Sequence, residues 1–450
     1  MSFIIGANSA VGGGYDVANS CRFNDGSSDY LNKTFGTPGG GIYKWTYSFW
    51  VKRSSLGEKA ITAPYYSGSF NGIIRFTSGD ALEVYDYRSG MILQKITSRL
   101  FRDLSAWYHI VVSNDNSVAS PETEIYVNGV KETSFSTTNE YSQNETNSFN
   151  NDYPNYIGQT GASSQYFDGY ISEFVYIDGT ALDPTSFGEF DEDSGIWKPI
   201  DVSGLTFGTN GFYLDFENSG ALGADVSGNT NNFTVNNLTA IDQSTDTCTN
   251  NFATLNPLIY QSRNNTFAEG NLKVTSATSD AWDTHYGIST IAVSSGKWYV
   301  ESKVTTTTTS QAILGLISTS QTITSSLKDN GVAAVEKSGR ITGGGINIET
   351  GLTAFSNGDI AAIAFDADAG TAQFYRNGSA YGSAVSSIAS DEYYFATTTY
   401  DTGGVVEFNF GSPPFTISSG NADGNGYGNF EYAVPSGYYA LNTKNLSEFG

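Results

Sequence analysis

Alternation of apolar and polar side chains with a period of two is the clearest pattern along the chain. It is strongest over residues 43–53, where large apolar side chains occupy every second position: Tyr43, Trp45, Tyr47, Phe49 and Val51. The intervening positions are polar or charged except for Trp50. Successive side chains of a strand point to opposite faces of a sheet. The segment therefore predicts a strand with one face in the core, and Trp50 is expected to pack under a loop or against a partner.

Three further segments of the first half predict strands. Residues 106–113 and 166–176 are dense in aromatic and β-branched side chains. Residues 124–132 contain the dipeptide Asn128-Gly129, which is typical of a tight hairpin turn with two positive φ angles. Short strands at 211–216 and 232–235 are expected to complete this half.

The second half shows the same succession of strand, turn, strand and Asn-Gly as the first, but its sequence is different. Strands are predicted at 296–304, 358–366 and 371–376, and the last of these ends in Asn377-Gly378. The stretch 242–271 between the halves is polar and interrupted by proline, as a junction would be. Since no repeat of about 20–50 residues is present, a propeller or solenoid is disfavoured.

Composition narrows the fold class to all-β. The 450 residues include 29 Tyr, 28 Phe and 50 Gly but only 2 Met, and 39% of the chain is hydrophobic. Aromatic residues favour pleated strands and glycine favours tight turns. The length exceeds one ordinary core. Two all-β domains in tandem are therefore predicted.

The net charge and the lack of long apolar runs exclude nucleic acid and the membrane interior as partners, and the N-terminus and cysteines bear on where the protein is made. The net charge of −24 repels phosphate backbones, so no nucleic-acid partner is expected. No run of about 18 apolar residues occurs, so no membrane insertion is expected. The N-terminus lacks the features of a signal peptide. Two cysteines, Cys21 and Cys248, suit synthesis in a reducing compartment, and whether they pair is left open.

Motifs in both halves resemble known domain families. The first half resembles a laminin-G-like, concanavalin-A-like domain through Phe-Trp-Val-Lys (49–52), Trp-Tyr-His-Ile-Val-Val (107–112), Ile-Tyr-Val-Asn-Gly (125–129) and Phe-Asp-Gly-Tyr-Ile-Ser-Glu-Phe (167–174). The second half is similar to a SPRY domain through Ser-Gly-Lys-Trp-Tyr-Val-Glu (295–301), Gly-Asp-Ile-Ala-Ala-Ile-Ala-Phe-Asp (358–366), Phe-Tyr-Arg-Asn-Gly (374–378), Phe-Asn-Phe-Gly (408–411) and Pro-Ser-Gly-Tyr-Tyr-Ala-Leu-Asn-Thr (435–443).

These resemblances imply two β-sandwich domains in tandem, of the concanavalin-A-like or jelly-roll kind, and a division of the chain into four parts. Residues 1–22 form an N-terminal segment, either an edge strand or an attachment to a larger particle. Residues 23–241 form the laminin-G-like sandwich, 242–271 a linker, and 272–450 the SPRY-like sandwich.

The whole arrangement also resembles structural proteins of marine tailed bacteriophages. Two segments carry this resemblance, Ile-Ile-Gly-Ala-Asn-Ser-Ala (4–10) and Asp-Thr-Cys-Thr-Asn-Asn-Phe-Ala-Thr-Leu-Asn-Pro-Leu (246–258). Cys248 stands where the resemblance leads us to expect proline, which argues against an obligatory disulfide.

The phage resemblance implies a non-enzymatic virion protein made in the host cytoplasm. It would be a tail fibre or receptor-binding component, with other virion proteins and a host-surface glycan as partners, and it would act as a homo-oligomer. The alternatives are a capsid-decorating or tail-assembly protein without a ligand and, less favoured, a polysaccharide depolymerase.

The candidate residues for catalysis do not form a recognisable set. Retaining glycosidases need two carboxyl groups about 5–5.5 Å apart. The pair Glu189 and Asp191 begins such a pattern, but Ser194 occupies the position of its last acid. Glu83 and Asp86 have the wrong parity to share one face of a strand. We therefore expect no enzyme activity.

The candidate ligand-binding residues are aromatic or polar side chains in loops, together with Trp50. SPRY-type domains bind partners with loops at one end, and the matching positions here are Trp282, His285, Tyr286, Tyr400 and Asp401.

Several other residues are assigned to the core or to a metal. His109, Trp45, Trp107 and Trp298 are expected in the core. No motif requires a cofactor. The laminin-G-like resemblance leaves calcium open, with the nominal ligands Asp115, Asp168 and the cluster Asp191-Glu192-Asp193.

Overall fold

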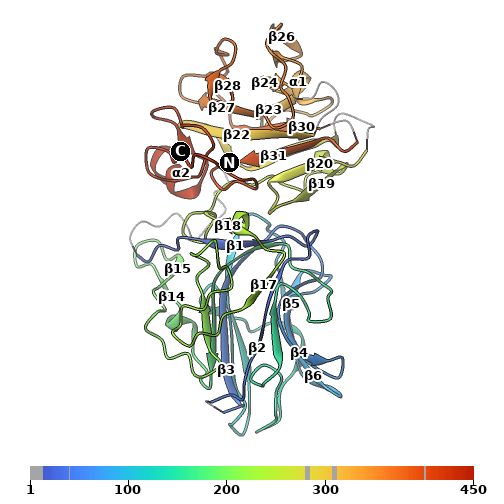
Figure 1. Cartoon of the computed structure of the whole chain (residues 1–450), viewed down its shortest axis with the longest axis vertical. Coiled ribbons are helices and arrows are strands. Elements are labelled where there is room, and N and C mark those ends of the chain that lie inside the picture. The colour runs from blue at the N-terminus through green and yellow to red at the C-terminus, as the bar shows by residue number, and fades with distance from the viewer. Residues whose placement is uncertain (1–13, 40, 279–283, 307–311, 400–401) are drawn as a thin grey trace. The chain divides into compact units, whose positions relative to one another are not determined.

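The structure is a computed structural model that describes residues 14–39, 41–278, 284–306, 312–399 and 402–450 (Figure 1). It confirms the all-β class, with sheets that are antiparallel except where β32 (Tyr439–Ala440) pairs with β22 (Lys297–Thr306) in parallel. The described residues also form two short α-helices, α1 (Leu327–Asn330) and α2 (Thr443–Phe449). The chain divides into two compact units, Met1–Thr249 and Asn250–Gly450. Within the described ranges no helix combines the length and the apolar character needed to cross a membrane.

The first unit contains two large sheets. The first sheet has the order β10 (Val130–Lys131), β9 (Thr123–Val127), β8 (Trp107–Asp115), β3 (Lys44–Arg53), β13 (Gly169–Asp178), β1 (Ser20–Phe23) and β18 (Gln243–Ser244), and β16 (Phe212–Leu214) also pairs with β13. The second sheet has the order β11 (Phe135–Asn139), β7 (Met91–Leu100), β6 (Ala81–Arg88), β5 (Phe70–Phe76), β4 (Lys59–Ser67), β12 (Pro154–Ile157), β2 (Tyr30–Thr34) and β17 (Thr234–Asn236). A small hairpin joins β14 (Gly188–Phe190) to β15 (Trp197–Pro199).

The inner faces of these two sheets share one core. The odd-numbered side chains of β3 from Trp45 to Val51 lie in it, as the alternation predicted. They pack against Ile74 of β5 and Val84 of β6 from the second sheet. Stacked rings within the core include Trp45 with Phe149, whose centroids are 4.5 Å apart. The unit is therefore a β-sandwich.

The outer face of the first sheet is also buried, and Trp50 packs there under covering segments, which is one of the two alternatives expected for it. Trp50, Trp107, Tyr170 and Trp197 form a second cluster there with Val17 and Cys248. The covering segments come from both ends of the unit, since the Val17 amide donates to Thr249 Oγ1 over 3.1 Å. Every residue of β3 except Lys44 is consequently buried.

Residue His109 lies in this second layer as a hydrogen-bonded core residue, as expected. Its ring stacks on Trp50, accepts a hydrogen bond from Trp197 Nε1 over 2.9 Å, and contacts Ser48 Oγ at 2.9 Å. Burial lowers the pKa of His109 to about 3, so the imidazole is neutral at physiological pH.

The described part of the N-terminal segment forms an interior strand. β1 begins at Ser20 and lies between β13 and β18, so the expectation of an edge strand is wrong for these residues. Residues 1–13 lie outside the described ranges. Cys21 and Cys248 are both free and buried, so they do not pair in this structure.

The second unit contains two further sheets. The third sheet has the order β19 (Asn265–Ala268), β20 (Lys273–Ser276), β31 (Val405–Asn409), β22 (Lys297–Thr306), β27 (Ile360–Asp366), β28 (Thr371–Arg376) and β29 (Ser379–Ala380), and β32 (Tyr439–Ala440) pairs with β22. The fourth sheet has the order β21 (Tyr286–Val293), β30 (Tyr393–Thr398), β23 (Ala312–Ser318), β24 (Ala333–Glu336), β25 (Arg340–Gly343) and β26 (Ile346–Glu349). One core unites both sheets and includes Trp298, Leu316 and Phe395.

Both predicted Asn-Gly turns are present. Asn128 and Gly129 have φ angles of 49° and 75° and connect β9 to β10. Asn377 and Gly378 have φ angles of 48° and 76° and connect β28 to β29.

The stretch 242–271 contains the division between the units but is not an unstructured linker. Its residues Gln243 and Ser244 form β18 of the first sheet. Asn265–Ala268 form β19 of the third sheet. Between these two strands, Phe252 and Leu255 form isolated bridges with Asn442 and Ser289 of the second unit.

Candidate functional site

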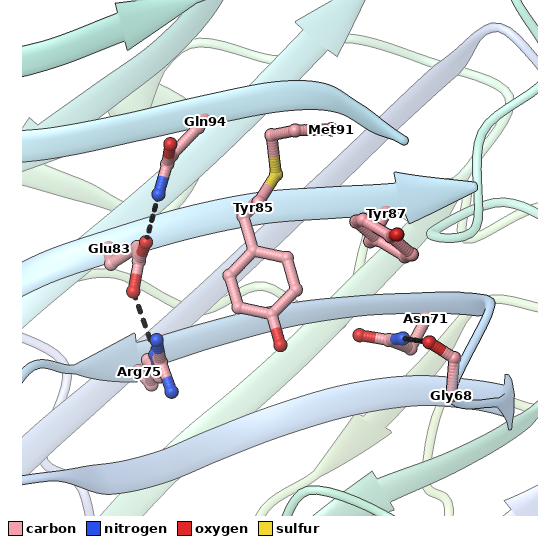
Figure 2. Close-up of a pocket in the computed structure, with 8 residues that line it drawn as sticks. All are labelled: Gly68, Asn71, Arg75, Glu83, Tyr85, Tyr87, Met91 and Gln94. Carbon is pink, nitrogen blue, oxygen red and sulfur yellow. Dashed lines mark hydrogen bonds and ion pairs between the residues drawn. The ribbon is translucent and has the colours of Figure 1, made fainter. Parts of the chain in front are cut away.

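The outer face of the second sheet carries an open hollow of about 320 Å³ (Figure 2). Strand β6 alternates, so that Leu82 and Val84 enter the core while Glu83, Tyr85 and Tyr87 point outward. The neighbouring strands and turns supply the remaining lining residues: Gly68, Asn71, Arg75, Met91 and Gln94. The hollow is therefore built by three adjacent strands, β5, β6 and β7.

A row of hydrogen-bonded polar side chains crosses these strands. Gln94 Nε2 donates to Glu83 Oε1 over 2.8 Å, and Arg75 Nε donates to Glu83 Oε2 over 2.7 Å (Figure 2). Arg75 also donates to Glu58 Oε1 over 2.6 Å and to Gln165 Oε1 over 3.1 Å. Since each group is fixed by its neighbours, the polar edge of the hollow is organised before any ligand binds.

The aromatic side of the hollow is supported from beneath. Tyr85 packs on Ala60, Ala63 and Ile73, which form a small apolar cluster on the same outer face. The Arg75 guanidinium lies 5.3 Å from the centre of the Tyr85 ring. Burial raises the pKa of Tyr85, so its hydroxyl stays protonated and able to donate.

The hollow combines apolar ring faces with fixed hydrogen-bonding groups. Tyr85, Tyr87 and the 41% exposed Met91 offer flat or soft apolar surface. Gln94 and Asn71 place amides beside them. A sugar ring has the complementary chemistry, an apolar face with hydroxyl groups at its edge.

A carboxylate pair for glycoside hydrolysis is missing from the hollow. Glu83 is the only acid among the described lining residues, and both of its oxygens are occupied by Arg75 and Gln94. Asp86 points to the other face of β6, where it accepts hydrogen bonds from Tyr141 Oη over 2.9 Å and the Ser148 amide over 2.6 Å. The opposite parity of Glu83 and Asp86 is thus confirmed.

The structure does not bring the predicted ligand-binding residues together. Trp50 is 1% exposed beneath the covering segments of the first sheet. His285 and Tyr286 are fully buried in the second unit, where Tyr286 Oη donates to the Ser325 carbonyl over 2.8 Å. These burials correct the expectation that the three residues are presented to a ligand. Trp282, Tyr400 and Asp401 lie outside the described residues.

The nominal calcium ligands are engaged separately. Asp115 pairs with Lys44 at 2.9 Å, Asp191 pairs with Lys198 at 3.3 Å, and Asp168 is buried. Across the described ranges no three or more His, Cys, Asp or Glu side chains gather as a metal site would require.

Sequence reasoning missed the hollow, although a signal for it was present. Positions 83, 85 and 87 alternate with the core residues of the same strand and carry one acid and two tyrosines. The partners of this row on β5 and β7 depend on strand register, which the sequence does not specify.

Comparisons with solved structures find several distant likenesses. A putative carbohydrate binding protein from Bacteroides ovatus is 17% identical, with a TM-score of 0.34, and the match covers 49% of this chain and 59% of that one. The SPRY domain of human HERC1 is 18% identical, with a TM-score of 0.27, covering 30% of this chain and 87% of that one. A heptameric SAP-like pentraxin from Limulus polyphemus is 14% identical, with a TM-score of 0.29, covering 37% and 79%. Identities and TM-scores this low carry no inference about function.

A comparison with curated proteins finds no match. A comparison with protein families finds one within the first unit. Residues 25–185, which contain every residue of the hollow, match the concanavalin A-like lectin/glucanases superfamily, in agreement with the laminin-G-like resemblance of this segment.

Proposed function

We propose that the chain is a non-enzymatic carbohydrate-binding protein and that the hollow on the second sheet holds a neutral sugar. The observation that carries this proposal is the aromatic surface of Tyr85 and Tyr87 beside the fixed row Gln94–Glu83–Arg75. The hollow lies within the segment that matches a superfamily of lectins and glucanases. The lone, ion-paired carboxylate favours binding over hydrolysis.

A shallow site of this size binds weakly by itself. Several copies presented together bind more tightly through avidity, without any new contact. A homo-oligomer, as the phage resemblance implies, would supply those copies.

Binding of neutral oligosaccharides tests the proposal. A panel of neutral tetrasaccharides immobilised on a surface is screened with the full chain, and the affinity of the best ligand is measured by calorimetry. Tyr87→Ala removes one ring face and is expected to weaken binding about 2- to 10-fold. Adding Gln94→Ala removes a hydrogen-bonding group and is expected to bring the loss to about 10-fold or more.

The matched control is Tyr260→Ala, which removes a tyrosine that is 65% exposed in the second unit. It is expected to leave the affinity unchanged. Equal affinity of all three variants and the wild type, or no binding of any neutral tetrasaccharide, would contradict a sugar site in the hollow.

We further propose that the protein is a virion component made in the host cytoplasm, a tail fibre or receptor-binding part that contacts a host-surface glycan. This proposal is supported by the resemblance of residues 4–10 and 246–258 to phage structural proteins. Labelling of purified particles with an antibody to the chain, viewed by electron microscopy, is expected to place it at a fibre or tail tip. Particles that carry no label would contradict the proposal.

A capsid-decorating or tail-assembly role is favoured by one observation in the second unit. The edge strand β26 exposes Ile346 and Ile348, and an exposed edge strand with apolar side chains can pair with a strand of another protein. Label spread over the capsid would support this alternative.

A further inference from the structure

A second cluster of aromatic side chains lies at the end of the first sandwich, on the opposite face of β5 and β6 from the hollow. Phe70 and Arg88 are paired in register at the ends of these strands and continue the inward-facing rows of Ile74 and Val84. Tyr66 of β4 and Tyr153, which precedes β12, complete the cluster. We call these four residues, Tyr66, Phe70, Arg88 and Tyr153, the rim cluster.

The rim cluster holds a guanidinium in a fixed position. Arg88 donates to Tyr153 Oη over 2.9 Å, and its guanidinium carbon lies 5.2 Å from the Phe70 ring centre and 5.8 Å from that of Tyr153. Tyr66 stacks on Tyr153 with centroids 5.2 Å apart and planes at 28°, and it is 66% exposed. One face of the assembly is therefore open to solvent.

The guanidinium of Arg88 lacks a carboxylate partner among the described residues, unlike the other arginines of the first unit. The other five arginines of the first unit each form an ion pair, in the pairs Arg22–Asp242, Arg53–Asp80, Arg75–Glu83, Arg99–Glu132 and Arg102–Asp80. The chain contains 46 acidic residues against 22 basic ones, so an arginine without a carboxylate is unexpected.

The nearest acid in the strand, Asp86, forms no ion pair with Arg88 in the described part of the chain, although the charge of Arg88 acts on it at longer range. Asp86 is buried and its carboxylate is held by Tyr141 and Ser148. Burial also raises the pKa of Asp86 to about 6, which weakens its charge further below neutral pH. Arg88 therefore keeps a positive charge and unused N–H donors beside an exposed ring.

We propose that the rim cluster binds an acidic sugar. The carboxylate or sulfate of the sugar pairs with the Arg88 guanidinium, and the apolar face of its ring lies on Tyr66. Arginine presents paired N–H donors that match an oxyanion, and tyrosine presents the flat surface that a sugar ring needs. The net charge of −24 opposes long-range attraction of such a ligand, but charges beyond about 8 Å are screened at physiological ionic strength.

The proposal does not depend on the hollow, because the two sites lie on opposite faces of the same strands. It predicts a preference for charge that a neutral-sugar site lacks. Galacturonic acid and galactose differ only at C6, which is a carboxylate in the first and a hydroxymethyl group in the second. Tetragalacturonate and the corresponding neutral galactose tetrasaccharide therefore form a matched pair of probes. A sulfated galactose tetrasaccharide distinguishes sulfate from carboxylate.

Calorimetry of the full chain with these three probes tests the proposal. We expect at least one acidic probe to bind about 10- to 100-fold more tightly than the neutral one. Arg88→Gln is expected to remove this difference, and Tyr66→Ala to weaken acidic binding about 2- to 10-fold. Binding is expected to weaken as salt is raised from 0.05 M to 0.5 M.

Two controls separate this site from other causes. Arg99→Gln removes an arginine that is paired with Glu132, and Tyr260→Ala removes a tyrosine that is 65% exposed in the second unit, so both are expected to keep the preference for the acidic probe. Because Tyr66 is mostly exposed, its variant reports on binding even if Arg88→Gln unfolds. Equal binding of acidic and neutral probes, no binding of either acidic probe, or full acidic binding by both rim variants would overturn the proposal.

Discussion

Replacing Asp246 with asparagine is expected to lower the free energy of unfolding by about 3–5 kcal/mol, because it removes the carboxylate charge that pairs with the buried Lys52 ammonium. Lys52 Nζ lies 2.7 Å from Asp246 Oδ2, and each side chain is 1% exposed. The second oxygen, Oδ1, accepts a hydrogen bond from Trp107 Nε1 over 3.0 Å. The substitution removes the charge while keeping the shape of the side chain.

The control for Asp246→Asn is Asp115→Asn on the same sheet. Asp115 pairs with Lys44 at 2.9 Å, but both side chains are substantially exposed, so this loss is expected to cost about 0–1 kcal/mol. The free energies are measured by urea denaturation of the full chain. Similar costs for the two variants would show that the outer face of the first sheet is open to water, contrary to the structure.

Replacing Glu173 with glutamine is expected to stabilise the protein in alkaline solution. Glu173 lies in the bulge of β13, where burial is the main cause that raises its pKa from 4.5 to about 8. The protonated acid stays in contact with Tyr213 Oη, 2.6 Å away, and Tyr213 Oη in turn lies 3.1 Å from Tyr15 Oη. This chain of contacts ties residue 15 to the outer face of the first sheet.

The sign of the pH dependence follows from the raised pKa. The contribution of Glu173 to stability is complete below pH 4.5 and is lost progressively as the pH rises from 4.5 to about 8, because the unfolded carboxyl releases its proton first. The loss amounts to about 3–5 kcal/mol over that interval.

The test compares the unfolding free energy of the wild type and Glu173→Gln at pH 5 and pH 9. The difference between the two proteins is expected to shift in favour of the variant by several kcal/mol at pH 9. Asp86 and Glu301 also titrate, but they are present in both proteins and cancel. A difference independent of pH would mean that Glu173 is ionised and solvated in the folded chain.

The strands that line the core can be predicted from the sequence, because the alternation of apolar and polar side chains shows which residues face inward. Trp45, Tyr47 and Phe49 occupy the inner face of β3 as their spacing predicts. The Asn-Gly dipeptides predict their hairpins for an equally local reason, since Asn128 and Gly129 accept positive φ angles.

The second buried layer could not be predicted in the same way. Trp50 falls on the polar side of its strand, and its burial depends on segments near residues 17 and 248, more than 30 and nearly 200 positions away. The pattern of side chains within a strand does not show which distant segments of the chain will cover it. The same reason explains His285 and Tyr286, whose polar and aromatic neighbourhood suggested an exposed loop although both are buried.

The candidate site depends on the pairing of strands. Alternation places Glu83, Tyr85 and Tyr87 on one face, but the hollow exists only because register sets Arg75 and Gln94 beside Glu83. A shift of one residue would turn these side chains to the other face.

The most direct test of the central claim is a crystal structure of the full chain with the neutral tetrasaccharide that it binds best. We expect a sugar ring on Tyr85 and Tyr87, with its hydroxyl groups in contact with Gln94 and Asn71. A sugar bound elsewhere on the chain, with the hollow empty at saturating ligand, would contradict the assignment of this face as the carbohydrate-binding site.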